Sequence, residues 1–97
     1  MILKNNISDI ESLENTSKQI YFHAQMEVNL CFQNSQTFLR INVAFELLPV
    51  SWFITSDNGK LVKSGVSYKS LLFISVSDLP KGEHTLRMKG EKFTFEV

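Results

Sequence analysis

The stretch Leu79-Pro80-Lys81-Gly82-Glu83-His84-Thr85-Leu86-Arg87-Met88 decides how the rest of the chain is interpreted. A Pro-x-Gly turn stands between two runs in which apolar and polar residues alternate. Such alternation is typical of a half-buried β-strand, because successive side chains point to opposite faces of a sheet. Proline and glycine supply the backbone angles of a tight turn. The stretch predicts a reversal around Pro80 and Gly82, followed by a strand whose side chains His84, Leu86 and Met88 face inward.

The segments on either side of this turn continue the same pattern. Upstream, alternating apolar residues predict a strand over 72–76, and downstream Gly90-Glu91 predicts a hairpin that leads into a last apolar strand. Further upstream, Asp57-Asn58-Gly59-Lys60 is the strongest hairpin signal of the chain. Asn58 and Gly59 both tolerate the positive φ that a tight hairpin turn needs. We expect Ser64-Gly65 to break the return strand and allow a switch to another sheet.

The first half of the chain predicts two more strands and the start of a third. Residues 26–33 alternate strictly, residues 34–36 turn the chain, and apolar residues at 39, 41, 43, 45 and 47 share one face up to Pro49. Trp52 is expected to be the largest member of the apolar core. About seven short strands with turns at near-regular spacing predict a two-sheet antiparallel sandwich over residues 26–97.

Residues 1–25 differ from the rest and are expected to form an irregular segment or a short helix. Ile7, Ile10 and Leu13 recur at helical spacing, and Ser8 with Glu11 resembles a capping box. A helix this short is marginal in water unless it packs against the domain.

The bulk properties narrow the functional classes. Ten basic and ten acidic residues cancel, which argues against a nucleic-acid partner or an electrostatic membrane anchor. No apolar run approaches the roughly 20 residues of a membrane-spanning helix. Cys31 is the only cysteine, so no intrachain disulfide can form. We also expect no signal peptide at the start of the sequence as given.

No constellation of reactive residues stands out, so we expect neither an enzyme nor a metal or cofactor site. A zinc site needs three or four ligands, and the chain offers His23 and His84 without suitably spaced partners. Cys31 lacks a setting that would activate a thiol. Asp57 and Asp78 stand at turn starts, where their side chains bind backbone groups. The basic residues of the second half are read as a solvated face or a modest anionic-ligand patch.

A set of apolar side chains out of phase with the core is the best candidate for an interaction surface. Phe38, Leu71 and Phe73 should point outward on two neighbouring strands, and Phe53 should point outward on the opposite sheet. An exposed apolar patch of this kind usually marks a contact with a protein partner or a second copy. Alternatively, Ile7, Ile10 and Leu13 fold back and cover Phe38 and Phe73. Both hypotheses remain open at this point.

Three segments also carry a resemblance to known families. Residues 57–62 resemble a D-x-G-(R/K)-x-V hairpin, residues 74–86 an L-P-x-G-x-Y-x-L segment, and residues 90–95 a closing G-x-x-x-x-F strand. In this order they resemble the small secreted immunoglobulin-like proteins of Bacteroidetes, whose function is unknown. They also resemble the related C-terminal sorting domain of type IX (Por) secretion.

The resemblance implies an immunoglobulin-like sandwich that is secreted, periplasmic or on the cell surface, and that acts as a binding or structural module. The alternative that it implies is a sorting domain separated from its cargo. His84 stands where both families usually place a tyrosine, whose hydroxyl ties back to the backbone near the preceding turn. Any partner would be held by an outer sheet face or an exposed edge strand.

Overall fold

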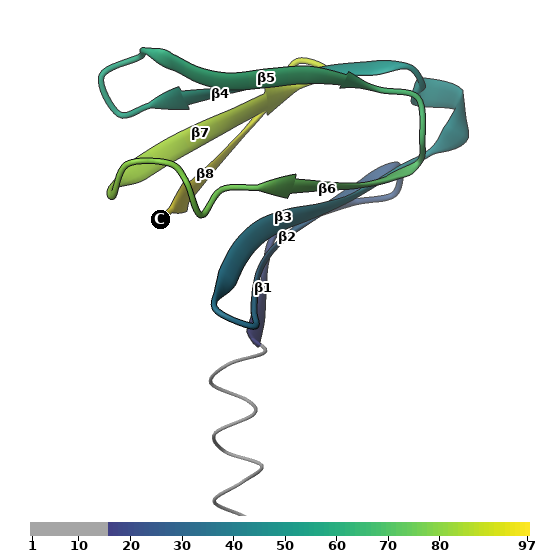
Figure 1. Cartoon of the computed structure of the whole chain (residues 1–97). Coiled ribbons are helices and arrows are strands. Elements are labelled where there is room, and N and C mark those ends of the chain that lie inside the picture. Colours follow the sequence, from purple (N-terminus) through teal and green to yellow (C-terminus); the bar gives the residue numbers. More distant parts are fainter. Residues whose placement is uncertain (1–15) are drawn as a thin grey trace, which may run out of the picture.

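The alternating segments form strands, and these strands make two antiparallel sheets that pack face to face (Figure 1). The computed structural model describes residues 16–97. Sheet A has the order β1-β2-β3-β6, made of β1 (Thr16–His23), β2 (Met26–Gln33), β3 (Gln36–Val43) and β6 (Leu71–Ser75). Sheet B has the order β5-β4-β7-β8, made of β5 (Leu61–Ser67), β4 (Val50–Ser56), β7 (Glu83–Met88) and β8 (Glu91–Glu96).

This topology confirms the predicted two-sheet antiparallel sandwich. The chain crosses between the sheets after β3, β5 and β6, so that β2 to β8 place three strands in one sheet and four in the other. The predicted pairing of the strands that carry Phe38 and Phe73 is also confirmed, because β3 pairs with β6. β1 is an eighth strand at the edge of sheet A.

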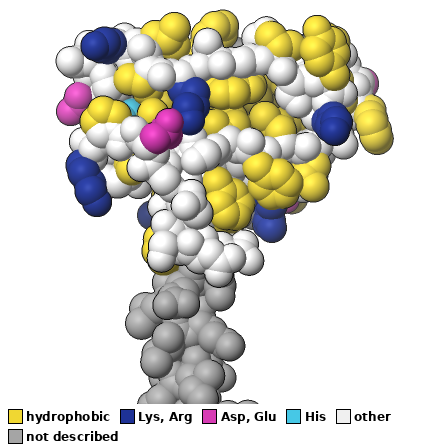
Figure 2. All heavy atoms as spheres, viewed as in Figure 1, with side chains coloured by type: hydrophobic (Ala, Val, Ile, Leu, Met, Phe, Trp, Pro, Cys, Tyr) yellow, Lys and Arg dark blue, Asp and Glu magenta, His cyan; other side chains and the backbone are white. Residues whose placement is uncertain are grey.

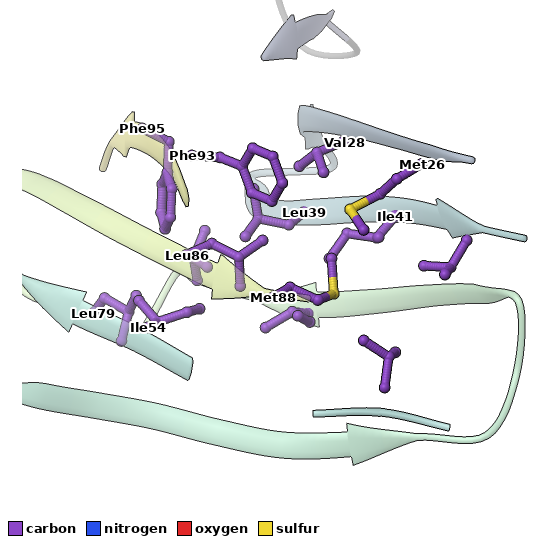
Figure 3. Packing of buried hydrophobic residues seen from close by; sticks show 14 residues of the cluster. Met26, Val28, Leu39, Ile41, Ile54, Leu79, Leu86, Met88, Phe93 and Phe95 are labelled. Carbon is purple, nitrogen blue, oxygen red and sulfur yellow. The ribbon is translucent and has the colours of Figure 1, made fainter. Parts of the chain in front are cut away.

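The core lies between the sheets and is made of the inward positions of both. Leu39 and Ile41 of sheet A and Ile54 and Leu86 of sheet B are completely buried. Figure 3 shows these side chains pointing toward one another from their strands. Burial of each such side chain contributes about 1.5–3 kcal/mol, so this layer is the main stabilising term.

The expected boundary at residue 26 is corrected by β1. Thr16–His23 form a strand that pairs with β2, whereas the sequence predicted an irregular or helical segment through residue 25. The pairing shifts between Gln19 and Tyr21, and this bulge breaks the alternation that would have indicated a strand. Ile20 and Tyr21 both pack against the core. The predicted helical spacing of Ile7, Ile10 and Leu13 lies outside the described residues.

The second predicted strand is shorter than expected. β3 ends at Val43, and Phe45–Leu47 form a single 3₁₀ turn instead of continuing the strand to residue 47. The amide of Leu48 closes this turn on the carbonyl of Phe45 at 3.1 Å. Phe45 therefore leaves the core and is 78% exposed.

The expected break at Ser64-Gly65 does not occur. β5 runs through Gly65, which pairs with Trp52 on β4. A Cβ atom at Gly65 would lie 2.6 Å from Cζ2 of Trp52, so the glycine makes room for the indole ring instead of ending the strand. Trp52 is half-buried at the border of the core and is not its centre.

The positive φ angles of the hairpin turns lie at other positions than the sequence predicted. At the β4–β5 turn only Gly59 has a positive φ, of 85°, while Asn58 does not. The amide of Gly59 donates to the carbonyl of Ser56 at 2.9 Å, as in a turn followed by a bulge. Two consecutive positive φ angles occur instead at Asn34 and Ser35, between β2 and β3, and at Lys89 and Gly90, between β7 and β8.

Candidate binding surfaces

The outer face of sheet A carries three of the four residues of the expected interaction surface. Phe38 lies on β3, and Leu71 and Phe73 lie on the neighbouring strand β6. The rings of Phe38 and Phe73 meet edge to face with their centroids 5.8 Å apart. Phe73 is 59% exposed and Leu71 is 44% exposed. The structure therefore brings these three side chains together at the surface.

A shallow hollow of about 370 Å³ opens beside these rings, and we call it the apolar hollow. Its lining consists of Thr16, Ser17, Cys31, Phe32, Gln33, Phe38, Arg40, Leu71 and Phe73. Arg40 is the one charged residue among them. On the side of the molecule shown in Figure 2, hydrophobic side chains are exposed over both layers and charged side chains lie singly among them.

Phe22 extends the apolar character of this face and was missed by the sequence analysis. It pairs with Glu27 of β2, which places it on the outer side of the edge strand β1, where it is 68% exposed. The signal was present in the Tyr21-Phe22 pair, of which one ring packs on the core and the other points outward. Because the sequence analysis did not predict β1, it could not assign Phe22 to either face of the sheet.

Three polar side chains on the rest of this face form hydrogen bonds with one another. The carboxylate of Glu27 accepts hydrogen bonds from the amide of Gln19 at 3.0 Å and from that of Asn29 at 3.2 Å. Asn29 is buried. This network is structural, since each of its hydrogen bonds is used within the sheet.

Phe53, the fourth predicted surface residue, lies on the outer face of sheet B. It pairs with Arg87 of β7, which in turn pairs with Lys92 of β8. A hollow of about 430 Å³, which we call the basic hollow, is lined by Ser51, Phe53, Arg87, Met88, Lys89, Gly90, Glu91 and Lys92. The two outer faces therefore differ in chemistry, although each is centred on phenylalanine.

An ion pair joins the two sheets where the edge strands β5 and β6 lie next to each other. Lys63 pairs with the buried Ile54 and so points inward from the edge strand β5. Its Nζ donates to the carbonyl of Ser75 at 2.7 Å and to the carboxylate of Asp78 at 3.1 Å. The hydrogen bond from Lys63 lowers the pKa of the Asp78 carboxyl below its ordinary value. A charged side chain directed inward protects an edge strand from pairing with other molecules.

The predicted turn residues lie where the chain reverses. Oδ1 of Asn58 accepts a hydrogen bond from the amide of Lys60 at 3.2 Å, and the hydroxyl of Ser56 also donates to it. The Pro80 turn leads into Gly82, whose φ is 124° and whose backbone exchanges two hydrogen bonds with Val97. These contacts hold the end of the chain beside the start of β7.

His84 occupies the first buried position of β7. Its Nδ1 donates to the carbonyl of Gly82 at 3.0 Å, and its ring stacks on Phe95 with centroids 5.8 Å apart. Nε2 is buried and has no hydrogen-bond partner within residues 16–97. This geometry is that of a corner bond, in which a ring at the start of a strand ties back to the preceding turn.

The potentially reactive side chains stay apart. Cys31 is buried on the outer side of sheet A, whereas His84 points into the core from sheet B, and His23 is exposed at the β1–β2 turn. Within the described part of the chain, no three His, Cys, Asp or Glu side chains gather as metal ligands. Nor do residues 16–97 contain a helix long and apolar enough to cross a membrane.

Comparisons with protein families, with curated proteins and with solved structures found no match to this chain.

Proposed function

We propose that the chain is a non-enzymatic binding module of the cell envelope or exterior, and that the apolar hollow is its contact surface. The observation that carries this proposal is the contact of the half-buried Phe38 with the exposed Phe73, together with the exposed Leu71, beside a hollow with a single charged residue. Leaving such rings in water has a cost of about 25 cal/mol for each Å² of apolar area, which a partner would relieve.

The location rests on the resemblance to the secreted immunoglobulin-like proteins of Bacteroidetes. His84 supports that resemblance, because its bond to Gly82 lies where both families usually place a corner tyrosine. The partner is a second copy of the chain, held by apolar contact with Phe73 at its centre.

The test compares self-association of the full chain with that of two matched variants, by sedimentation velocity over a range of concentrations. Phe73→Lys introduces a charge into the apolar hollow, whereas Phe53→Lys makes the same change on the opposite outer face. We expect Phe73→Lys to abolish association and Phe53→Lys to leave it intact. Equal behaviour of both variants, or binding of stoichiometric metal by the purified protein, would contradict the proposal.

A variant without residues 1–15 distinguishes an intramolecular cover from an open surface. It keeps all of β1, which begins at Thr16. If the removed residues cover Phe38 and Phe73, the variant should self-associate more strongly than the full chain. An unchanged association state would mean that the apolar hollow is open in the full chain.

A second candidate is a secretion-sorting domain recognised through the hairpin of β7 and β8. The observation that favours it is the exposure of that hairpin, where β8 is an edge strand and Glu91, Lys92, Thr94 and Glu96 are exposed. Fusing the chain behind a reporter in a host with type IX secretion tests this role. Export that depends on residues 89–97 would favour sorting over the binding module.

A further inference from the structure

The outer face of sheet B holds two cations directly opposite each other. Arg87 of β7 pairs with Lys92 of β8, and like charges in this arrangement destabilise a sheet. Within residues 16–97 the ion pair is that of Lys63 with Asp78, so no described carboxylate neutralises Arg87 or Lys92. Glu91 pairs with the buried Met88 and lines the end of the basic hollow at the β7–β8 turn, where no described ion pair joins it to Arg87 or Lys92. An anion bound from outside these residues would relieve the repulsion between Arg87 and Lys92.

A second like-charged pair limits how far such an anion can extend. Glu83 of β7 pairs with Glu96 of β8 at the other end of the same face. Arg87 lies four positions after Glu83 along β7, which corresponds to about 13 Å in a strand. A polyanion that ran along the strands would meet these carboxylates, so the favourable region is confined to the basic hollow.

The strand register fixes the distances between the side chains that line the basic hollow. Phe53, Arg87 and Lys92 form one row across three adjacent strands, and Phe53 is 46% exposed. With strands about 4.8 Å apart, the midpoint between the two cations lies roughly 7 Å from Phe53. In an extended peptide, side chains two residues apart point the same way and are also separated by about 7 Å.

We propose that the basic hollow binds a short extended segment of a partner protein, in which an acidic residue stands two positions from an apolar one. The apolar side chain lies over Phe53, and the carboxylate lies between Arg87 and Lys92. Arginine can hold a carboxylate with two parallel hydrogen bonds, which fixes its orientation. Lys89, in the β7–β8 turn, adds a third cation to the lining.

The short run of cations favours a peptide over a nucleic acid. Nucleic acids need a longer run of cations than the face provides before Glu83 and Glu96. This site lies on the face opposite the apolar hollow, so it does not rest on the proposed function.

The test uses the full chain and two synthetic peptides, acetyl-Leu-Ser-Glu-Ser-amide and the same peptide with Gln in place of Glu. Binding is followed by amide chemical shifts in two-dimensional NMR. We expect the acidic peptide to shift residues of β4, β7 and β8 around Phe53, Arg87 and Lys92. The neutral peptide should bind at least about fivefold more weakly, as expected for the loss of exposed ionic contacts.

Two charge reversals on β8 provide matched controls. Lys92→Glu and Glu96→Lys each turn a like-charged pair with β7 into an opposite pair, so each should raise Tm by about 2–4 °C. Only Lys92→Glu removes a cation from the basic hollow. It should weaken the acidic peptide about fivefold or more, whereas Glu96→Lys should leave its affinity unchanged.

Several results would overturn the proposal. Equal binding of the two peptides, or undiminished affinity in Lys92→Glu, would show that the cations do not hold the carboxylate. Shifts confined to Phe38 and Phe73 would place the peptide on the apolar hollow, which leaves the proposed function intact. Binding of heparin without binding of the acidic peptide would assign the basic hollow to an anionic polymer.

Discussion

The two outer faces of the sandwich are built by the same alternation but carry opposite chemistry. On sheet A the outward positions gather Phe38, Leu71 and Phe73 around a hollow with one charge. On sheet B they place like charges opposite each other at both ends of β7 and β8. The inward positions of the two sheets are alike, since both supply aliphatic and aromatic residues to one core. The fold is therefore specified by the inward positions, and the two outer faces are free to differ in their side chains.

The largest effect should come from an inward position. Leu86→Ala removes a completely buried side chain and should lower the free energy of unfolding by about 2–5 kcal/mol, because a cavity remains. The neighbouring outward substitution Arg87→Ala should change it by no more than about 0.5 kcal/mol. Urea unfolding measures both. Similar losses in the two variants would contradict the division between inner and outer positions.

Gly65→Ala should have the next largest effect. The new Cβ would lie 2.6 Å from Cζ2 of Trp52, so the indole must move at a cost of about 1–3 kcal/mol. Trp52 is the only tryptophan, so its fluorescence reports the movement directly. Ser64→Ala, on the outer side of the same strand, is the control and should leave both stability and fluorescence unchanged.

Substitutions at His84 test the corner bond. His84→Tyr should be tolerated or stabilising, because a hydroxyl can reach the backbone near the turn as the imidazole does. His84→Ala removes the bond to Gly82 and the stacking on Phe95, and should cost about 1–3 kcal/mol. Thermal unfolding distinguishes them. A large drop in Tm for His84→Tyr would argue against the resemblance to the tyrosine-bearing families.

A double-mutant cycle on Phe38 and Phe73 asks whether the apolar face stabilises the fold. Their edge-to-face contact is exposed, so the coupling from single and double alanine variants should be about 0.5 kcal/mol. Urea unfolding of the four proteins gives this value. A coupling clearly above 1.5 kcal/mol, the top of the usual range, would indicate a second small core and not a contact surface.

The smallest effect concerns the ion pair of Lys63 with Asp78. Because the hydrogen bond from Lys63 lowers the pKa of Asp78 in the folded state, the unfolded state binds the proton more readily. The pair therefore contributes stability above the ordinary value of 3.8, and this is lost as the pH falls through the lowered pKa. Asp78→Asn should reduce Tm slightly at neutral pH and not in strong acid, whereas Asp57→Asn, which breaks no ion pair, should match the wild type throughout.

The alternation of side chains along each strand made the inner and outer faces of the sheets predictable. The inward set around Leu39, Ile54 and Leu86 and the outward set around Phe38, Phe53 and Phe73 follow from alternation alone. The strand β1 was missed because its bulge changes the parity near Ile20. Gly65 was read as a break because the need for space comes from Trp52 on another strand.

The basic hollow could not have been predicted in the same way. The sequence places Arg87 and Lys92 near a turn, but it does not state that they are direct partners or that Phe53 continues their row. That row depends on which strands are neighbours and on the register of each pair. Contacts across strands are therefore the part of the site that needs the fold.

Lys63 has a consequence for how the protein behaves at high concentration. Its ammonium rests on the carbonyl of Ser75, so one side chain shields the borders of both sheets at the point where β5 and β6 come together. Acetylation would neutralise this amine and leave the unpaired edges of β5 and β6 exposed side by side. We expect the acetylated protein to aggregate at high concentration, because the edge strands of different molecules can then pair.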